Sequence, residues 1–161
     1  MARDELLPLA RRLGARLKRS RLLLVAAESC TGGWIAQAVT SVAGSSEWFE
    51  RGFVTYSNAS KRELLGVRAA TLARHGAVSE ETAREMAAGA LRRSRAQIAV
   101  AVTGVAGPGG GTRAKPVGMV CFAWALKKGG AQSAVRRFRG GRESVRRQSV
   151  VAALEGLLER I

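Results

Sequence analysis

The chain has 161 residues, a formal net charge of +15 and 47% hydrophobic residues, a length that predicts one domain whose core needs no disulfide staples. Cys30 and Cys121 offer neither a disulfide framework nor paired metal spacing. No apolar run is long enough to cross a bilayer, and Asp4 and Glu5 stand where a signal peptide would be basic. We therefore expect a cytoplasmic protein with no membrane contact, no metal site and no cofactor.

The positive charge comes from 22 arginines and five lysines. Arginine pairs with phosphate and carboxylate groups, so the charge fits a phosphorylated small molecule, a nucleic acid or a merely solvated surface. Aromatic residues make up only 5% of the chain and no nucleic-acid-binding motif is present, so nucleic acid is not expected as a partner. The densest basic cluster spans 136–147, where Arg142 follows two glycines at a predicted helix start and is the member expected to face a ligand.

Hydrophobic periodicity predicts helices and strands that alternate along the chain, closing with a hairpin and a helix. The predicted helices cover residues 4–19, 31–42, a short segment from Asn58, 79–93 and 142–158. The predicted strands cover residues 22–27, 52–56, 97–103, 117–126 and 133–138. The last two strands form an antiparallel hairpin. This order indicates an α/β fold with a mixed sheet and helices on both faces.

The segment Ala26–Gly33 places Ser29 between a buried strand and a predicted helix. At such a junction, free backbone N–H groups and the positive end of the helix dipole face any anion. Serine is also a common helix cap, which is the alternative role for Ser29. Gly32 and Gly33 favour a ligand site because they let a ligand approach the backbone, although close packing on the sheet explains them too. The position suits a nucleophile for acyl transfer.

A serine nucleophile here needs a base other than histidine, because the only histidine, His75, lies in a predicted loop before a helix. Lys61 is the natural choice, unless it is an exposed surface lysine. Its pKa must fall from about 10.4 to about 7 or 8, which corresponds to roughly 4 kcal/mol. Tyr56, at a strand end, either passes the proton or holds the lysine amine.

Two neighbours of Ser29 offer alternative chemistry. Cys30 is a rival nucleophile that would benefit from the same helix start, or else a small buried side chain. Glu28 either orients Lys61, acts as a base itself or simply interacts favourably with the helix dipole.

The glycine-rich loop over 103–112 is the second strong feature. It lacks the lysine followed by serine or threonine that ends a P-loop, and it leads to a strand, whereas Walker and Rossmann loops lead to a helix. Both motifs are therefore excluded. Its backbone N–H groups suit an anion or oxyanion site, and a flexible surface loop is the alternative. Thr103 and Gly104, at the carboxyl end of a central strand, are therefore candidate binding residues.

Four separated motifs, at 27–33, 52–58, 75–79 and 103–118, together resemble the CinA C-terminal-domain family, over nearly the whole chain. The resemblance implies a three-layer α/β/α fold with a mixed, mostly parallel five-stranded sheet, forming a single amidase domain over residues 1–161. It also implies hydrolysis of the carboxamide of nicotinamide mononucleotide, giving nicotinate mononucleotide and ammonia in pyridine-nucleotide salvage.

Carried over residue by residue, the resemblance implies that Ser29 is the nucleophile, Lys61 its base and Tyr56 an assisting hydroxyl. It also implies that Thr103 and Arg142 bind substrate. We expect backbone N–H groups at 31–33 or 103–104 to stabilise the oxyanion, and a homo-oligomer that takes a small-molecule nucleotide. A basic nucleic-acid-binding module and a non-catalytic oligomerisation domain are the alternatives.

Overall fold

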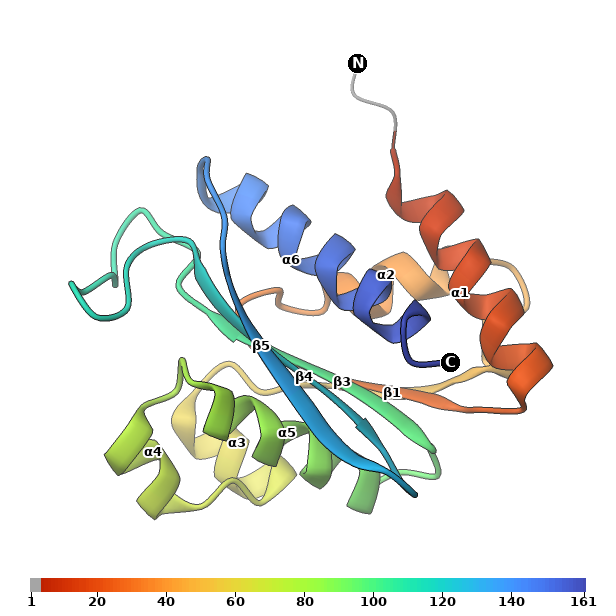
Figure 1. Ribbon diagram of the computed structural model, residues 1–161, viewed down its shortest axis with the longest axis horizontal. Helices are drawn as coiled ribbons and strands as arrows, with labels where there is room; N and C mark the ends of the chain where they lie inside the picture. The colour runs from red at the N-terminus through yellow and green to blue at the C-terminus, as the bar shows by residue number, and fades with distance from the viewer. Residues whose placement is uncertain (1–3) are drawn as a thin grey trace.

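A central five-stranded sheet separates two layers of helices in the computed structural model, which describes residues 4–161 (Figure 1). The α-helices are α1 (Leu6–Ser20), α2 (Trp34–Thr40), α3 (Asn58–Leu65), α4 (Ala69–His75), α5 (Glu80–Arg92) and α6 (Arg142–Leu158), with a short 3₁₀ helix η1 (Ser45–Glu47). The strands are β1 (Leu24–Glu28), β2 (Phe49–Val54), β3 (Ile98–Gly104), β4 (Met119–Leu126) and β5 (Gly130–Arg137). The three-layer α/β/α prediction is confirmed.

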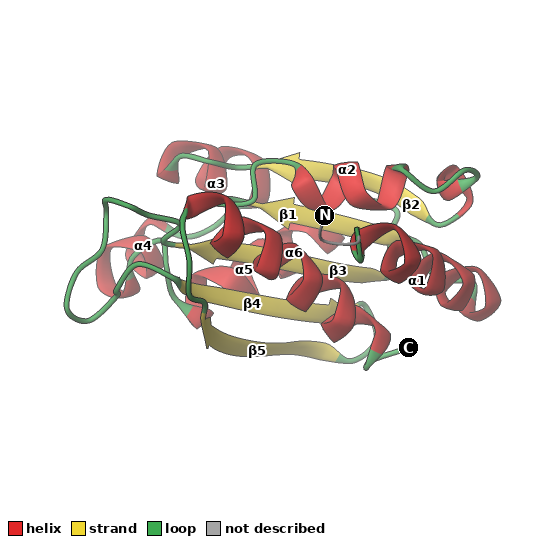
Figure 2. Cartoon of the chain, turned by 90° about the horizontal axis from the view of Figure 1, so that it is seen from above, coloured by secondary structure: helices red, strands yellow, loops and turns green. Residues whose placement is uncertain are grey.

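The strand order is β2-β1-β3-β4-β5 (Figure 2). Strand β1 is parallel to both β2 and β3, whereas β4 is antiparallel to β3 and to β5. Four strands therefore run in one direction and β4 alone runs in the other, which confirms a mixed, mostly parallel sheet with a C-terminal hairpin. The carboxyl ends of β1, β2 and β3 meet at one end of the sheet, where open α/β sheets bind their ligands.

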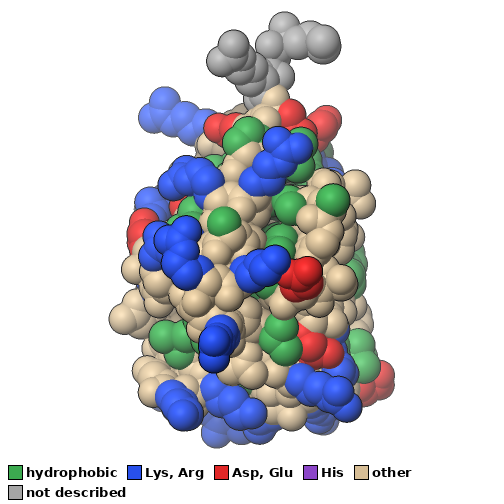
Figure 3. All heavy atoms as spheres, turned by 90° about the vertical axis from the view of Figure 1, so that its right-hand side faces the viewer, with side chains coloured by type: hydrophobic (Ala, Val, Ile, Leu, Met, Phe, Trp, Pro, Cys, Tyr) green, Lys and Arg blue, Asp and Glu red, His purple; other side chains and the backbone are tan. Residues whose placement is uncertain are grey.

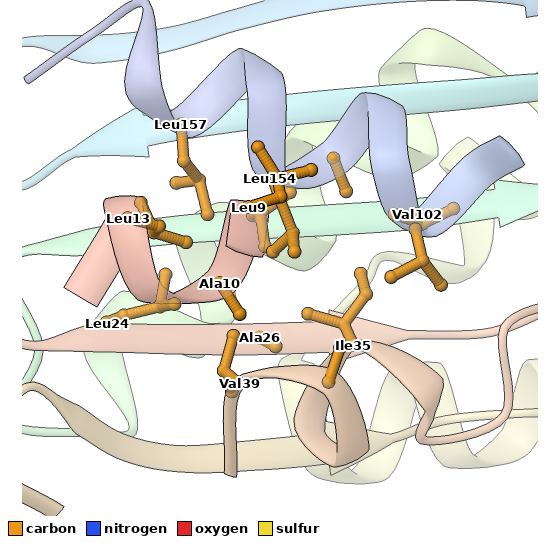
Figure 4. Close-up of a cluster of buried hydrophobic side chains, with 14 of the residues drawn as sticks. Leu9, Ala10, Leu13, Leu24, Ala26, Ile35, Val39, Val102, Leu154 and Leu157 are labelled. Carbon is orange, nitrogen blue, oxygen red and sulfur yellow. The ribbon is translucent and has the colours of Figure 1, made fainter. Parts of the chain in front are cut away.

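One layer consists of α1, α2 and α6, whose apolar stripes cover one face of the sheet (Figure 1). Because strand side chains alternate between faces, Leu24 and Ala26 of β1 point into this layer. They meet Leu13 of α1, Val39 of α2 and Leu154 of α6 in one dry cluster (Figure 4). This core fixes the start of α6 above the carboxyl ends of the parallel strands.

The opposite layer consists of α3, α4 and α5 and uses smaller side chains, with Val25 and Ala27 of β1 on this face. Here α3 and α5 approach closely at Gly89, where an added Cβ would lie 1.8 Å from the carbonyl oxygen of Leu65. Only glycine permits this contact, so it locks the end of α3 against α5. The contact matters for function because α3 carries Lys61.

The structure differs from the predicted elements at several places on both sides of the sheet; β5, for example, begins at Gly130 rather than residue 133. Helix α2 begins at Trp34 rather than residue 31, and β2 covers 49–54 rather than 52–56. Helix α4 was not predicted, because its alanine-rich sequence has helix propensity but only one large apolar side chain, Leu72. None of the helices within residues 4–161 is both long enough and apolar enough to cross a membrane.

Candidate active site

Ser29 and Lys61 lie in direct contact at the carboxyl end of β1. The Nζ atom of Lys61 is 3.0 Å from the Oγ atom of Ser29. Ser29 follows the last residue of β1, and Lys61 lies in α3, 32 residues further along the chain. Both side chains are buried, with exposed fractions of 8% for Ser29 and 1% for Lys61. The alternative of an exposed surface lysine is therefore wrong.

The local sequence fixes where α3 begins and so where Lys61 lies. Ser57 caps the helix by accepting a hydrogen bond from the backbone N–H of Ser60, whose hydroxyl accepts one from the backbone N–H of Ser57. This reciprocal capping box satisfies two N–H groups that the first turn leaves unpaired. Lys61 follows directly, which directs its side chain back toward the strand ends.

The environment of Lys61 favours a neutral amine. Its Nζ atom also lies 2.8 Å from the carbonyl oxygen of Thr55 and 3.4 Å from that of Tyr56. Within residues 4–161, no carboxylate forms an ion pair with it. Burial therefore lowers the pKa of Lys61, because the charged form has lost water without gaining a counter-ion. A neutral amine can donate to the two carbonyls while its lone pair accepts the hydroxyl proton of Ser29.

Tyr56 lies beside this pair, but its hydroxyl is engaged elsewhere. The hydroxyl oxygen accepts a hydrogen bond of 3.0 Å from the Nη2 atom of Arg142, and the side chain is 62% exposed. Tyr56 holds the lysine amine through its backbone carbonyl instead. The expectation that Tyr56 holds the lysine amine therefore agrees with its carbonyl contact, whereas a part for its hydroxyl in proton transfer stays a prediction.

Arg142, the first residue of α6, spans the mouth of the pocket. Its Nη1 atom donates a hydrogen bond of 2.8 Å to the carbonyl oxygen of Gly107, while Nη2 reaches Tyr56. The guanidinium thus connects the glycine-rich loop to the segment between β2 and α3. The pocket has a volume of about 280 Å³ and is lined by Ser29, Cys30, Tyr56, Lys61, Ala77, Val78, Arg142 and most of the loop 103–110.

The Glu28 side chain occupies the place at the start of α2 where an external anion would otherwise bind. Its buried carboxylate accepts hydrogen bonds from the hydroxyl of Thr31 at 2.7 Å and from the backbone N–H groups of Ile35 at 2.8 Å and Ala36 at 3.1 Å. The first N–H groups of α2 therefore face an internal carboxylate, which agrees with the alternative in which Glu28 interacts with the helix dipole. The backbone N–H groups of Thr31 and Gly33 have no acceptor within residues 4–161, so oxyanion donors at 31–33 stay a prediction. Glu28 makes no hydrogen bond to Lys61, so it does not orient the lysine directly.

The predicted binding residues after Ser29 are displaced from the pocket. Thr31 is fully buried against Glu28, while Gly32 and Gly33 line a neighbouring groove that shares Arg142 with the pocket. The reason is the turn that separates β1 from α2, since both glycines have positive φ angles of 58° and 99°. Both glycines therefore provide the backbone conformation of this turn.

Thr103 and Gly104 line the pocket at the end of β3, as predicted. The hydroxyl of Thr103 donates a hydrogen bond of 2.8 Å to the carbonyl oxygen of Ala77, so it fixes the 75–79 segment as a pocket wall. In the loop that follows, the backbone N–H groups of Ala106, Gly107, Gly109 and Gly110 have no acceptor within residues 4–161. They are available to a ligand, which fits the predicted anion site.

Cys30 does not have the environment of a reactive thiol. Burial raises its pKa to about 12, despite its own backbone N–H group and the nearby Arg146 guanidinium. The thiol is therefore protonated near neutral pH and a poor nucleophile. Its side chain belongs to the apolar core beneath α2 and α6.

Two features of the site were given no role from the sequence. Ala77 and Val78 lie in the 75–79 motif and form a wall of the pocket, but their small apolar side chains gave no chemical signal of that role. Arg146 donates to the turn after Ser29, at 3.0 Å to the carbonyl of Cys30 and 3.1 Å to that of Thr31. Its spacing of four residues from Arg142 puts both on one face of α6, a signal that could have identified it.

Within residues 4–161, no three His, Cys, Asp or Glu side chains cluster as a metal site requires.

Together, the fold and the pocket define an α/β/α enzyme with a buried serine–lysine pair at the carboxyl ends of parallel strands. Residues 6–161 match the sequence model of the CinA C-terminal domain, and the chain belongs to this family. It is 51% identical to nicotinamide-nucleotide amidohydrolase PncC of Escherichia coli K12 over 157 residues, covering 98% of this chain and 95% of the relative. It is 53% identical to the Pseudomonas putida protein of the same name, over 97% of both chains.

The fold agrees with a solved structure of the same family. The crystal structure of competence/damage inducible protein CihA from Agrobacterium tumefaciens superposes with a TM-score of 0.95 at 48% sequence identity. The match covers 99% of this chain and 97% of that one. The amidohydrolase relatives and the pocket identify the chain as a hydrolase.

Proposed function

We propose that this chain hydrolyses the carboxamide of nicotinamide mononucleotide to nicotinate mononucleotide and ammonia, with Ser29 as nucleophile and Lys61 as general base. The observation that carries the proposal is the 3.0 Å contact between Lys61 Nζ and Ser29 Oγ, two buried side chains that line the pocket. The names of the most similar relatives supply the substrate class. Salvage of pyridine nucleotides in the cytoplasm follows from that substrate.

Acylation begins when neutral Lys61 takes the hydroxyl proton of Ser29 directly. The oxygen of Ser29 bonds to the amide carbon, and the carbonyl electrons move onto its oxygen. The unpaired N–H groups of the glycine-rich loop line the same pocket as Ser29 and can donate to this oxyanion. Collapse of the intermediate re-forms the carbonyl and breaks the carbon–nitrogen bond, while Lys61 returns the proton to the departing nitrogen, which leaves as ammonia.

Deacylation repeats the same proton transfers with water. Lys61, again neutral, accepts a proton from water as the water oxygen attacks the ester carbon. The second intermediate collapses with cleavage of the bond to the Ser29 oxygen, and Lys61 returns its proton to that oxygen. The carboxylic acid product loses its proton to solvent and leaves as its carboxylate, and the enzyme regains its starting state.

Arg142 is the residue we assign to the phosphate. It lies at the pocket mouth, it is exposed, and its guanidinium retains donors beyond those given to Gly107 and Tyr56. Arginine–phosphate pairs are strong because both partners are charged and the hydrogen bonds are often paired. The carboxamide at Ser29 and the phosphate at Arg142 would then occupy opposite ends of one pocket.

The alternative of a nucleic-acid-binding module has less support. Lysine and arginine side chains are spread over the end of the sheet that lies away from the pocket, and do not gather in one patch there (Figure 3). Only 5% of residues are aromatic, so platforms for stacking bases are scarce. We also propose that the enzyme is a homo-oligomer.

A comparison of three substrates tests the proposal. Ammonia release is measured from nicotinamide mononucleotide, nicotinamide riboside and nicotinamide. We expect kcat/KM to be about 10- to 100-fold higher for the mononucleotide, because a charged hydrogen-bonded pair contributes about 1.5–3 kcal/mol. Arg142→Gln should reduce the ratio of kcat/KM for the mononucleotide to kcat/KM for the riboside. Arg113→Gln, at an exposed position outside the pocket lining, should leave this ratio unchanged. Absence of ammonia from all three substrates would overturn the proposal.

A further inference from the structure

We propose that Arg146 and Glu28 are positioning residues that clamp the turn carrying Ser29 from its two sides. The inference rests on the proposed function, since it concerns how the nucleophile is held. Residues 29–32 form this turn, closed by a hydrogen bond of 3.0 Å from the backbone N–H of Gly32 to the carbonyl oxygen of Ser29. We call these four residues the nucleophile turn.

Arg146 holds the nucleophile turn from the outside, across 116 residues of sequence. Its Nε and Nη2 atoms donate to the carbonyl oxygens of Cys30 and Thr31, the two central residues of the turn. The planar fork of arginine suits two adjacent acceptors, which a lysine amine cannot reproduce. The guanidinium also lies over the ring of Trp34, 5.4 Å from its centroid, which fixes its orientation.

Close packing shows that the turn and Arg146 are matched in shape. Gly32 has a φ angle of 58°, and a Cβ atom added there would lie 3.4 Å from the Nη2 atom of Arg146. Glycine therefore provides the backbone conformation of the turn, and the guanidinium lies within van der Waals reach of it.

Glu28 holds the nucleophile turn from the inside. Its carboxylate accepts from the Thr31 hydroxyl in the turn and from the backbone N–H groups of Ile35 and Ala36 in α2. A carboxylate with no exposed surface requires such partners, because an unpaired buried charge is strongly destabilising. Glu28 thus connects β1, the turn and α2, while Arg146 connects the turn to α6.

This arrangement explains how a serine outside regular secondary structure keeps its contact with Lys61. A nucleophile displaced by about 1 Å loses on the order of 100-fold in rate. Neither clamp residue contacts Ser29 Oγ or Lys61 Nζ, so their effect is on placement and not on proton transfer. The clamp would therefore govern kcat more than substrate affinity.

The test compares Arg146→Ala with Arg147→Ala, the next residue of α6, which pairs with Asp4 instead. For nicotinamide mononucleotide, we expect kcat to fall about 10- to 100-fold in Arg146→Ala with KM changed less than about threefold. Millimolar guanidinium chloride should restore part of kcat to Arg146→Ala only, and Arg146→Lys should recover less than wild type. A raised KM with unchanged kcat would make Arg146 a substrate-binding residue and overturn the proposal.

A second measurement needs no substrate. Hydrogen exchange of backbone amides at 29–34 should be faster in Arg146→Ala than in wild type or Arg147→Ala, while exchange in β3 and β4 stays the same. If wild type does not hydrolyse the mononucleotide, the proposed function fails, whereas the clamp is still judged by this exchange. Unchanged exchange at 29–34 in Arg146→Ala would refute the clamp.

Discussion

Replacement of Ser29 by alanine should reduce kcat for ammonia release from nicotinamide mononucleotide by at least about 10³-fold. The hydroxyl of Ser29 is the only side-chain oxygen within residues 4–161 that is hydrogen-bonded to Lys61, so no neighbour can replace it. The rate is measured under single-turnover conditions, which separates chemistry from product release. Substrate binding should change little, since the variant keeps Arg142 and the pocket walls.

Two variants distinguish this loss from general damage and from thiol chemistry. Ser46→Ala, at an exposed position of η1 remote from the pocket, should match wild type. Cys30→Ala should retain most of the activity, because the thiol pKa of about 12 keeps the sulfur protonated. Full activity in Ser29→Ala combined with loss in Cys30→Ala would transfer the nucleophile to the thiol and reject the serine mechanism.

Replacement of Lys61 by methionine should lower kcat by about 10²- to 10⁴-fold, the usual contribution of a general base. Methionine matches lysine in length but removes the amine that accepts the Ser29 proton. Lys128→Met, in the exposed turn between β4 and β5, is the matched control and should keep wild-type activity. Loss of activity in both variants, or in neither, would contradict the assignment of Lys61.

The pH dependence of wild type provides an independent check on the same residue. Only neutral Lys61 acts as a base, and burial lowers its pKa from the ordinary 10.5. The value of kcat/KM should therefore rise tenfold per pH unit while most of the lysine is protonated, and reach a plateau above a midpoint that lies below 10.5. Lys61→Met should lose this ascending limb. A wild-type rate that falls as pH rises through neutrality would argue against a lysine base.

The pairing of Ser29 with Lys61 was predictable because each followed from local signals. An apolar strand, β1, leads directly to the hydroxyl of Ser29, and α3 begins with a cap just before Lys61. Because the chain has only one histidine, few combinations of nucleophile and base remained. The parallel strands then brought the two segments to one end of the sheet. Local pattern and global topology agree at this point.

The details around the pair depended on tertiary contacts that no local pattern reveals. Helix α2 was expected to begin at Thr31, but the carboxylate of Glu28 takes the first helical N–H groups and moves the start to Trp34. Tyr56 was expected to contribute its hydroxyl, yet its contact with Lys61 is made by the backbone carbonyl, while the hydroxyl accepts a hydrogen bond from Arg142. Glu28 has several possible roles, and Arg142 lies on a segment far along the chain from Tyr56. The spacing of residues in the sequence therefore does not determine these contacts.

The central claim, an acyl-enzyme on Ser29, is tested most directly by rapid acid quench of the wild-type enzyme with nicotinamide mononucleotide, followed by peptide mass spectrometry. During the first turnover, the peptide containing Ser29 should carry the nicotinate mononucleotide acyl group, with fragmentation placing the ester on the serine oxygen. Release of one equivalent of ammonia while Ser29 stays unmodified at every quench time, or an adduct on Cys30 instead, would rule out Ser29 as the nucleophile.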